Sequence, residues 1–234
     1  MRSRDGFFVS ASGALLLLVL AGFSHTYYLR LYLGTADLPV AMQQLPGYLH
    51  LHGIVLTLWF LLGILQPSLI AAGRADVHRR VGWVGAALAA ALVIVTLNVI
   101  VNALPRLPLV GVPAEAVPLV IVGDLLALVV FVGLVSSAVL LRRSPETHKR
   151  LMLLASIAIV GPAVARIPGA QGQPLLLVGL QLAFLIAMGV HDRLRLGRIH
   201  RATAIGAVLI VVGMVAGIAL GASSVGRAIV AALA

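Results

Sequence analysis

The stretch YLHLHGIVLTLWFLLGILQPSLIAAGRADVHRR, from Tyr48 to Arg80, decides the fold class. Its first part, Tyr48–Ala72, contains no charged residue and is long enough to cross a hydrocarbon core of about 30 Å as a helix. Arg74, Arg79 and Arg80 then follow in a short turn. An uncharged apolar run that ends in a basic turn is typical of a transmembrane helix that emerges on the cytoplasmic side.

The same pattern recurs along the chain and predicts its topology. Apolar runs of spanning length occupy Phe7–Ser24, Tyr48–Ala72, Val81–Leu104, Val117–Leu141, Leu151–Ile167, Pro174–Val190 and Ala202–Ala222. Most of the 17 basic residues lie on one side of a seven-pass path, namely Arg2, Arg4, Arg74, Arg79, Arg80, Arg142, Arg143, Lys149, Arg150, Arg193, Arg195, Arg198 and Arg201. We therefore expect an all-α polytopic membrane bundle of seven transmembrane helices, with the N-terminus cytoplasmic and the C-terminus outside.

Composition supports one membrane domain over residues 1–234. The chain is 61% hydrophobic and 10% charged, so no stretch remains for a second, soluble core. The net charge of +10 does not indicate nucleic acid, because it is spread over short turns, where anionic lipid headgroups are the natural partners. The absence of cysteine excludes disulfides, thiolate metal sites, iron–sulfur clusters and c-type haem.

The first apolar run is expected to be a retained helix. Met1-Arg-Ser-Arg resembles the start of a signal peptide, but the run is longer than a usual signal core, and Ala21-Gly-Phe-Ser lacks a small-x-small cleavage site. Between this run and the second, Tyr27, Tyr28, Leu31 and Tyr32 have the spacing of a helix that lies in the membrane interface and caps the outer face. The proline-rich stretch Pro105–Pro118 predicts an extended, stiff crossover.

Two turns on the basic side repeat one motif. Asp76-Val-His78-Arg-Arg and Glu146-Thr-His148-Lys-Arg both read acid, any residue, histidine, base, arginine, and each opens a helix. The acid suits a helix N-terminus and the bases suit the topology rule, so the motif is explained by helix entry. The alternative is that His78 and His148 bind a cofactor, because imidazole is a common ligand of haem iron and other metals.

On the outer side, polar residues lie inside the apolar runs at similar depth. His50 and His52 open the second run and point about 200° apart around a helix, so a regular helix cannot turn both toward one partner. His52 shares a face with Leu56, Trp59 and Gln66, which makes it the inward-facing candidate. A ligand site is one interpretation, and an interhelical hydrogen-bond network that only holds the bundle is the other. The expected cluster is His52, Asn98, Asn102, Asp124, Arg166 and Gln181.

Several functions fit such a cluster, and one class does not. Haem b, copper or zinc would use His25, His50 or His52, with His50, His52 and Asp124 as a metal set. A membrane zinc hydrolase ranks lower because no His-x-x-x-His pair is present, so whether the chain is an enzyme stays open. A retinal protein is excluded, because Lys149 is the sole lysine and does not lie within a span. A transporter ranks second. Helices two to seven would form three hairpins of the same orientation, whereas transporters typically contain inverted repeats.

A resemblance adds to these expectations. The motifs Leu-His50-Leu-His52-Gly, His78-Arg-Arg-Val-Gly82, His148-Lys-Arg-Leu-Met152 and Gly197-Arg-Ile-His200 together resemble a group of bacterial multi-pass membrane proteins that has no established activity. Single motifs are also similar to those of haem–copper oxidase maturation proteins and of transmembrane b-type cytochromes. The resemblance implies a seven-pass fold and favours haem or metal handling.

These observations lead to one leading hypothesis and two alternatives. The leading hypothesis is a bacterial inner-membrane protein that binds haem or a transition metal, through His50 or His52 with His25, for electron transfer or assembly of a respiratory complex. The alternatives are binding or transport of a small solute or lipid, and an accessory structural subunit. The pattern Gly213-Met-Val-Ala-Gly217 favours close helix packing, either within the chain or in a homo-oligomer.

Overall fold

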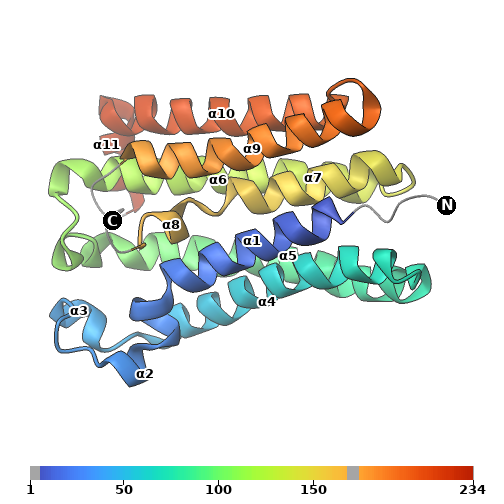
Figure 1. Ribbon diagram of the computed structural model, residues 1–234. Coiled ribbons are helices and arrows are strands. Elements are labelled where there is room, and N and C mark those ends of the chain that lie inside the picture. The colour runs from blue at the N-terminus through green and yellow to red at the C-terminus, as the bar shows by residue number, and fades with distance from the viewer. Residues whose placement is uncertain (1–5, 168–173, 234) are drawn as a thin grey trace.

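The computed structural model describes residues 6–167 and 174–233, and every element in them is helical. The long helices run side by side along one axis (Figure 1). They are α1 (Phe7–Gly22), α4 (Gly47–Ala71), α5 (Ala75–Ala103), α6 (Val117–Leu140), α7 (Pro145–Ala158), α9 (Pro174–Leu196) and α10 (Arg201–Ala222). The all-helical class is therefore confirmed.

The surface of these helices is suited to lipid. Within the described residues, four segments are long and apolar enough to cross a membrane: Gly47–Ala71, Ala75–Asn102, Ala114–Leu140 and Arg201–Ala222. Their outer faces carry exposed large apolar side chains such as Leu58, Val129 and Val212. Exposure of this much apolar surface to water is unfavourable, whereas contact with lipid tails carries no such free-energy penalty. The expectation of a membrane-spanning chain is confirmed at this level.

The bundle has two chemically different ends. The turns Ala72–Arg74, Leu141–Ser144 and Gly197–His200 lie at one end, together with the start of α1 (Figure 1), and we call this the basic end. Gly73 and Gly197 have φ of 78° and 70°, which lets α4 and α9 stop abruptly before these short turns. The opposite end carries the short helices α2, α3, α8 and α11.

Small residues on α10 bring it close to α6 within one chain. A Cβ atom added at Gly221 would lie 2.7 Å from the Leu119 Cα, and one added at Gly217 would lie 3.2 Å from the Gly123 Cα. Gly213 faces a side-chain methyl of Val130. The small-residue pattern predicted from the sequence is thus used for packing inside the protomer.

The fifth apolar run does not form one continuous helix. Helix α7 ends at Ala158, and the four-residue helix α8 (Gly161–Val164) follows after a turn. Pro162 has no N–H to offer the carbonyl of Ala158, so the helix is interrupted. The buried Gln181 of α9 compensates at this break, because its Nε2 donates to the Ile157 carbonyl at 2.8 Å and lies 3.5 Å from the Ala158 carbonyl.

Two connecting segments close the end opposite the basic turns. After α1, the chain forms a π-helical turn, η1 (Ser24–Tyr28), and then α2 (Arg30–Leu33) and α3 (Val40–Gln43). Arg30 fastens α2 to α3, because its Nη2 donates to the carbonyls of Met42 and Gln43. Leu31 and Tyr32 remain exposed, as an interfacial segment requires.

The connection between α5 and α6 differs from its prediction. Instead of an extended crossover, it forms three 3₁₀ turns, η2 (Leu104–Arg106), η3 (Pro108–Val110) and η4 (Ala114–Ala116). Pro108 is the first residue of η3 and Pro105 the second residue of η2, where the fixed φ of proline suits a helical turn. A further helix that was not predicted, α11 (Ser224–Leu233), packs Val230 and Leu233 against the apolar cluster of Ile100, Leu104, Val117 and Ile121.

Candidate functional site

A cavity of about 200 Å³ opens at the end of the bundle opposite the basic turns. It lies among α1, η1, α4, α5, α6 and α8, and the segment around α3 contributes to its mouth. Its wall is mostly apolar: Val19, Phe23, Met42, Leu45, Leu49, Leu56, Phe60, Leu92, Val99, Ile100, Ala127, Leu128, Ile159, Pro162 and Ala163. The polar lining residues are Thr26, Tyr27, Tyr28, His52, Thr96, Asp124 and Arg166.

Three residues of the predicted outer cluster meet in this cavity. His52 comes from the second turn of α4, Asp124 from the second turn of α6, and Arg166 lies just beyond α8. The positive charge of Arg166 acts on both His52 and Asp124. Its Nη1 donates to the Pro162 carbonyl at 2.8 Å, and its guanidinium lies 5.0 Å from the centre of the Phe23 ring. The interruption after α7 therefore positions the arginine.

The cavity contains polar atoms that the protein leaves without partners. Thr26 Oγ1, His52 Nδ1 and Thr96 Oγ1 are buried and have no hydrogen-bond partner within the described residues. They come from three different elements, η1, α4 and α5, yet all three residues line this one cavity. A buried hydroxyl or imidazole without a partner costs about 1–3 kcal/mol. Three such groups around one space indicate a site that accepts hydrogen-bonding molecules.

The π-helical turn holds two tyrosines over the mouth. Tyr28 Oη and Thr57 Oγ1 are 2.7 Å apart, and Tyr27 Oη donates to the His50 carbonyl at 3.2 Å. Gly53 is needed here, because a Cβ at this position would lie 2.6 Å from the Tyr27 ring. Burial, with a smaller contribution from Tyr28, raises the pKa of the Tyr27 phenol, so it remains a neutral hydrogen-bonding group.

Other predicted site residues lie elsewhere. His50 is exposed on α4, and His25 Nε2 is 3.3 Å from a carboxylate oxygen of Asp37, so the structure does not gather His25, His50 and His52 around one point. Asn98 and Asn102 are exposed on α5 and bond along that helix, from Asn102 Nδ2 to the Asn98 carbonyl at 2.8 Å. Gln181 serves the broken helix and does not line the cavity.

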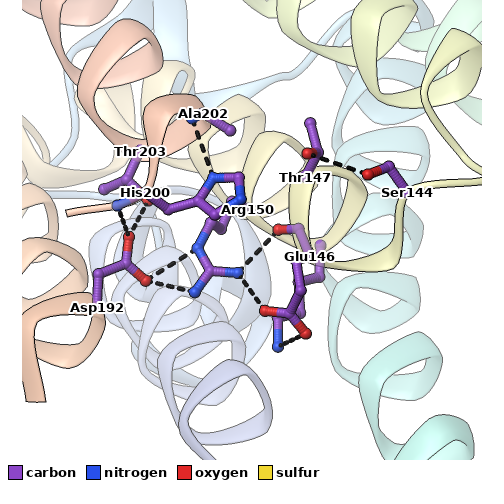
Figure 2. Close-up of polar contacts among 9 residues, drawn as sticks. Ser144, Glu146, Thr147, Arg150, Asp192, His200, Ala202 and Thr203 are labelled. Atoms are coloured by element: carbon purple, nitrogen blue, oxygen red, sulfur yellow. Dashed lines mark hydrogen bonds and ion pairs between the residues drawn. The ribbon is translucent and has the colours of Figure 1, made fainter. Parts of the chain in front are cut away.

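The basic end contains a buried polar network that was not predicted from the sequence. Figure 2 shows Arg150 between Asp192 and Glu146, and both Arg150 and Asp192 are 1% exposed. Arg150 Nε donates to Asp192 Oδ1 at 2.9 Å, and Nη1 donates to Glu146 Oε2 at 2.6 Å. Asp192 Oδ2 accepts from the His200 amide at 3.0 Å and from Thr203 Oγ1 at 2.5 Å.

This network joins α7, α9 and α10. Burial alone would raise the pKa of Asp192, but the hydrogen bonds from Arg150, Thr203 and the His200 amide exceed that effect and hold the pKa below its usual range. Each Asp192 oxygen accepts two hydrogen bonds, so the carboxylate is saturated. A saturated buried ion pair leaves no room for a ligand and acts as a structural clamp.

The histidines of the two repeated turns come together at the basic end. The rings of His78 and His148 are 6.3 Å apart between centroids, with planes inclined by 85°. His148 Nδ1 lies 2.9 Å from the Ala138 carbonyl, and His78 Nδ1 is buried with no partner in the described part of the chain. Over the described residues, no group of three or more His, Cys, Asp or Glu is placed to hold a metal ion.

No protein-family model, curated protein or solved structure matches this chain.

Proposed function

We propose that the protein binds a small amphipathic molecule in the cavity lined by His52, Asp124 and Arg166. The observation that carries this proposal is that three residues with unpartnered buried polar atoms, Thr26, His52 and Thr96, line one mostly apolar cavity. Ligand sites are typically apolar cavities with a few polar groups that fix orientation. Of the functions considered from the sequence, binding of a small solute or lipid fits this site best.

The dimensions and chemistry of the cavity define the class of ligand. An apolar cavity of about 150 Å³ accommodates benzene, so the space here suits one substituted ring or a short branched chain. The polar groups supply both donors and acceptors, since Arg166 only donates, a carboxylate at Asp124 only accepts, and the threonine hydroxyls do both. The ligand should therefore carry a hydroxyl or carbonyl on an apolar body.

A pair of matched probes tests the proposal. We expect 4-propylphenol to raise the melting temperature of the purified protein more than propylbenzene does, because the phenol satisfies polar atoms that the hydrocarbon leaves unpaired. Ala127→Phe, which fills the cavity, should abolish this difference. Val129→Phe adds the same ring on the exposed face of α6 and should preserve it. Equal responses to both probes in the wild type would refute a polar ligand site.

The topology belongs to the same proposal. All seven apolar runs cross a bacterial inner membrane, with the basic end in the cytoplasm and the cavity toward the outside. The clustering of the basic turns and the start of α1 at one end supports this orientation (Figure 1). Since the chain has no cysteine, Ser144→Cys and Ser223→Cys provide single labels. An impermeant maleimide applied to intact cells should modify the second variant only.

Haem or metal binding remains a separate prediction, with electron transfer or assembly of a respiratory complex as its role. Its outer ligands, His25, His50 and His52, do not converge in the structure. One observation favours a metal at the other end, and it concerns His78 and His148.

A further inference from the structure

The two repeated turns bring equivalent histidines close together, with their ring planes inclined by 85°. His78 is the fourth residue of α5 and His148 is the fourth residue of α7, and each follows an acidic residue at the second position. The requirements of a helix N-terminus and of membrane topology account for the acidic and basic residues of the motif. It does not account for two imidazoles 6.3 Å apart between ring centroids.

The hydrogen bonds of the two rings leave one lone pair free on each. A carbonyl only accepts, so the contact of 2.9 Å between His148 Nδ1 and the Ala138 carbonyl places the proton on Nδ1. Nε2 then carries the lone pair. His78 Nδ1 is buried and has no hydrogen-bond partner among the described residues, so it can offer a lone pair. Metal-binding histidines commonly show the arrangement of His148, in which one nitrogen donates to a backbone carbonyl.

The separation of the rings selects the coordination geometry. Two metal–nitrogen bonds of about 2 Å on opposite sides of an ion place imidazole centroids about 6 Å apart, whereas a tetrahedral angle draws them to about 5 Å. The observed 6.3 Å matches the open, near-linear arrangement. Among the described residues no third His, Cys, Asp or Glu joins the pair. The pair therefore suits an ion that is satisfied by two nitrogen ligands.

We propose that His78 and His148 bind one copper(I) ion between them at the basic end of the bundle. Copper(I) accepts two opposed imidazoles, whereas zinc needs about four ligands. The nearby positive charge of Arg79, which acts on His78, also penalises a divalent ion more than a monovalent one. This site is independent of the ligand cavity, since none of its residues lines that cavity.

Anaerobic titration of the purified full-length protein with copper(I), in competition with bicinchoninate, tests the proposal. We expect one equivalent to bind, and X-ray absorption should show two nitrogen neighbours. His78→Asn and His148→Asn should each weaken binding by at least about 100-fold, since each removes half of the ligand set. The exposed His50 provides the control, and His50→Asn should bind as the wild type does.

Three results would overturn the proposal. The first is equal copper(I) affinity in the His78→Asn/His148→Asn double variant, provided that thermal unfolding shows it to be folded. The second is zinc binding by the wild type that copper(I) does not displace. The third is a Soret band lost in the same variants, which would assign the two imidazoles to haem iron. The phenol-binding assay above involves the other end of the bundle, so its outcome does not decide this one.

Discussion

Removal of the Asp192 carboxylate tests the clamp at the basic end most directly. In Asp192→Ala, the Arg150 guanidinium stays buried at 1% exposure and retains only the partners on Glu146. The His200 amide and the Thr203 hydroxyl lose their acceptor at the same time. We expect the variant to lose about 3–5 kcal/mol of unfolding free energy, which is typical when one partner of a buried ion pair is removed.

The double variant Arg150→Met/Asp192→Leu distinguishes loss of the ion pair itself from the penalty of leaving one buried charge unpaired. Replacing both partners with apolar side chains of similar volume removes the desolvation cost together with the attraction. We expect it to be more stable than Asp192→Ala, with a coupling energy of about 1–3 kcal/mol between the two positions.

Unfolding in a denaturant titration of detergent-solubilised protein measures these differences. Thermal unfolding provides a second reading, at roughly 2–4 °C per kcal/mol for a chain of this size. Glu146→Ala is the matched control, because Glu146 is half exposed and its loss leaves the Asp192 bonds in place, so its cost should stay near 1 kcal/mol. A loss below about 1 kcal/mol in Asp192→Ala would refute the argument that this pair holds α7, α9 and α10 together.

Two further predictions concern pH and helix packing. The pKa of Asp192 in the folded protein lies below its unfolded value of about 3.9, so its contribution is complete above that pH and is lost as the pH falls through the lower, folded value. The unfolding free energy of the wild type should therefore decline below about pH 4 more steeply than that of Asp192→Asn, and parallel curves would contradict the depressed pKa. Gly221→Ala should cost about 1–3 kcal/mol, because the new Cβ would lie 2.7 Å from the Leu119 Cα, whereas Gly133→Ala, whose Cβ would meet no atom within 4 Å, should be nearly neutral.

The helical class and the basic turns were predictable because hydrophobicity and charge are properties of short segments. A run such as Tyr48–Ala72 has one stable conformation in lipid, whatever its neighbours. The interruption of the helix after Ala158 was harder to predict from the sequence. A proline within an apolar run favours a kink, but the extent of this one depends on Gln181 from another helix, which donates to the carbonyls of Ile157 and Ala158. The 3₁₀ turns after α5 depend in the same way on local packing that proline content alone does not define.

Part of the candidate site was predictable from depth alone. His52, Asp124 and Arg166 lie at matching depths in their runs, and the structure brings them to one cavity. Asn98 and Asn102 have the same depth but face away from it. Their orientation could not be derived from the sequence, because the lipid-facing and interior-facing sides of these helices are almost equally apolar. The pairing of Arg150 with Asp192 depends on helix packing over a separation of 42 residues, so local patterns could not predict it either.

The Asp192 clamp and the cavity differ in how completely their polar groups are satisfied, and this difference bears on function. At the basic end, the Asp192 carboxylate uses every hydrogen-bonding position within the protein. In the cavity, Thr26, His52 and Thr96 each retain a buried atom without a partner in the described residues. A network that only holds helices together gains stability from each hydrogen bond that it completes, so unpaired groups in it would lower the stability of the protein without benefit. Groups that serve a ligand have to stay available, and the stability that they forgo is recovered when the ligand binds. The clamp therefore performs the structural role that the sequence had left open for the outer cluster, and the incomplete hydrogen bonding of the cavity supports its assignment as the binding site.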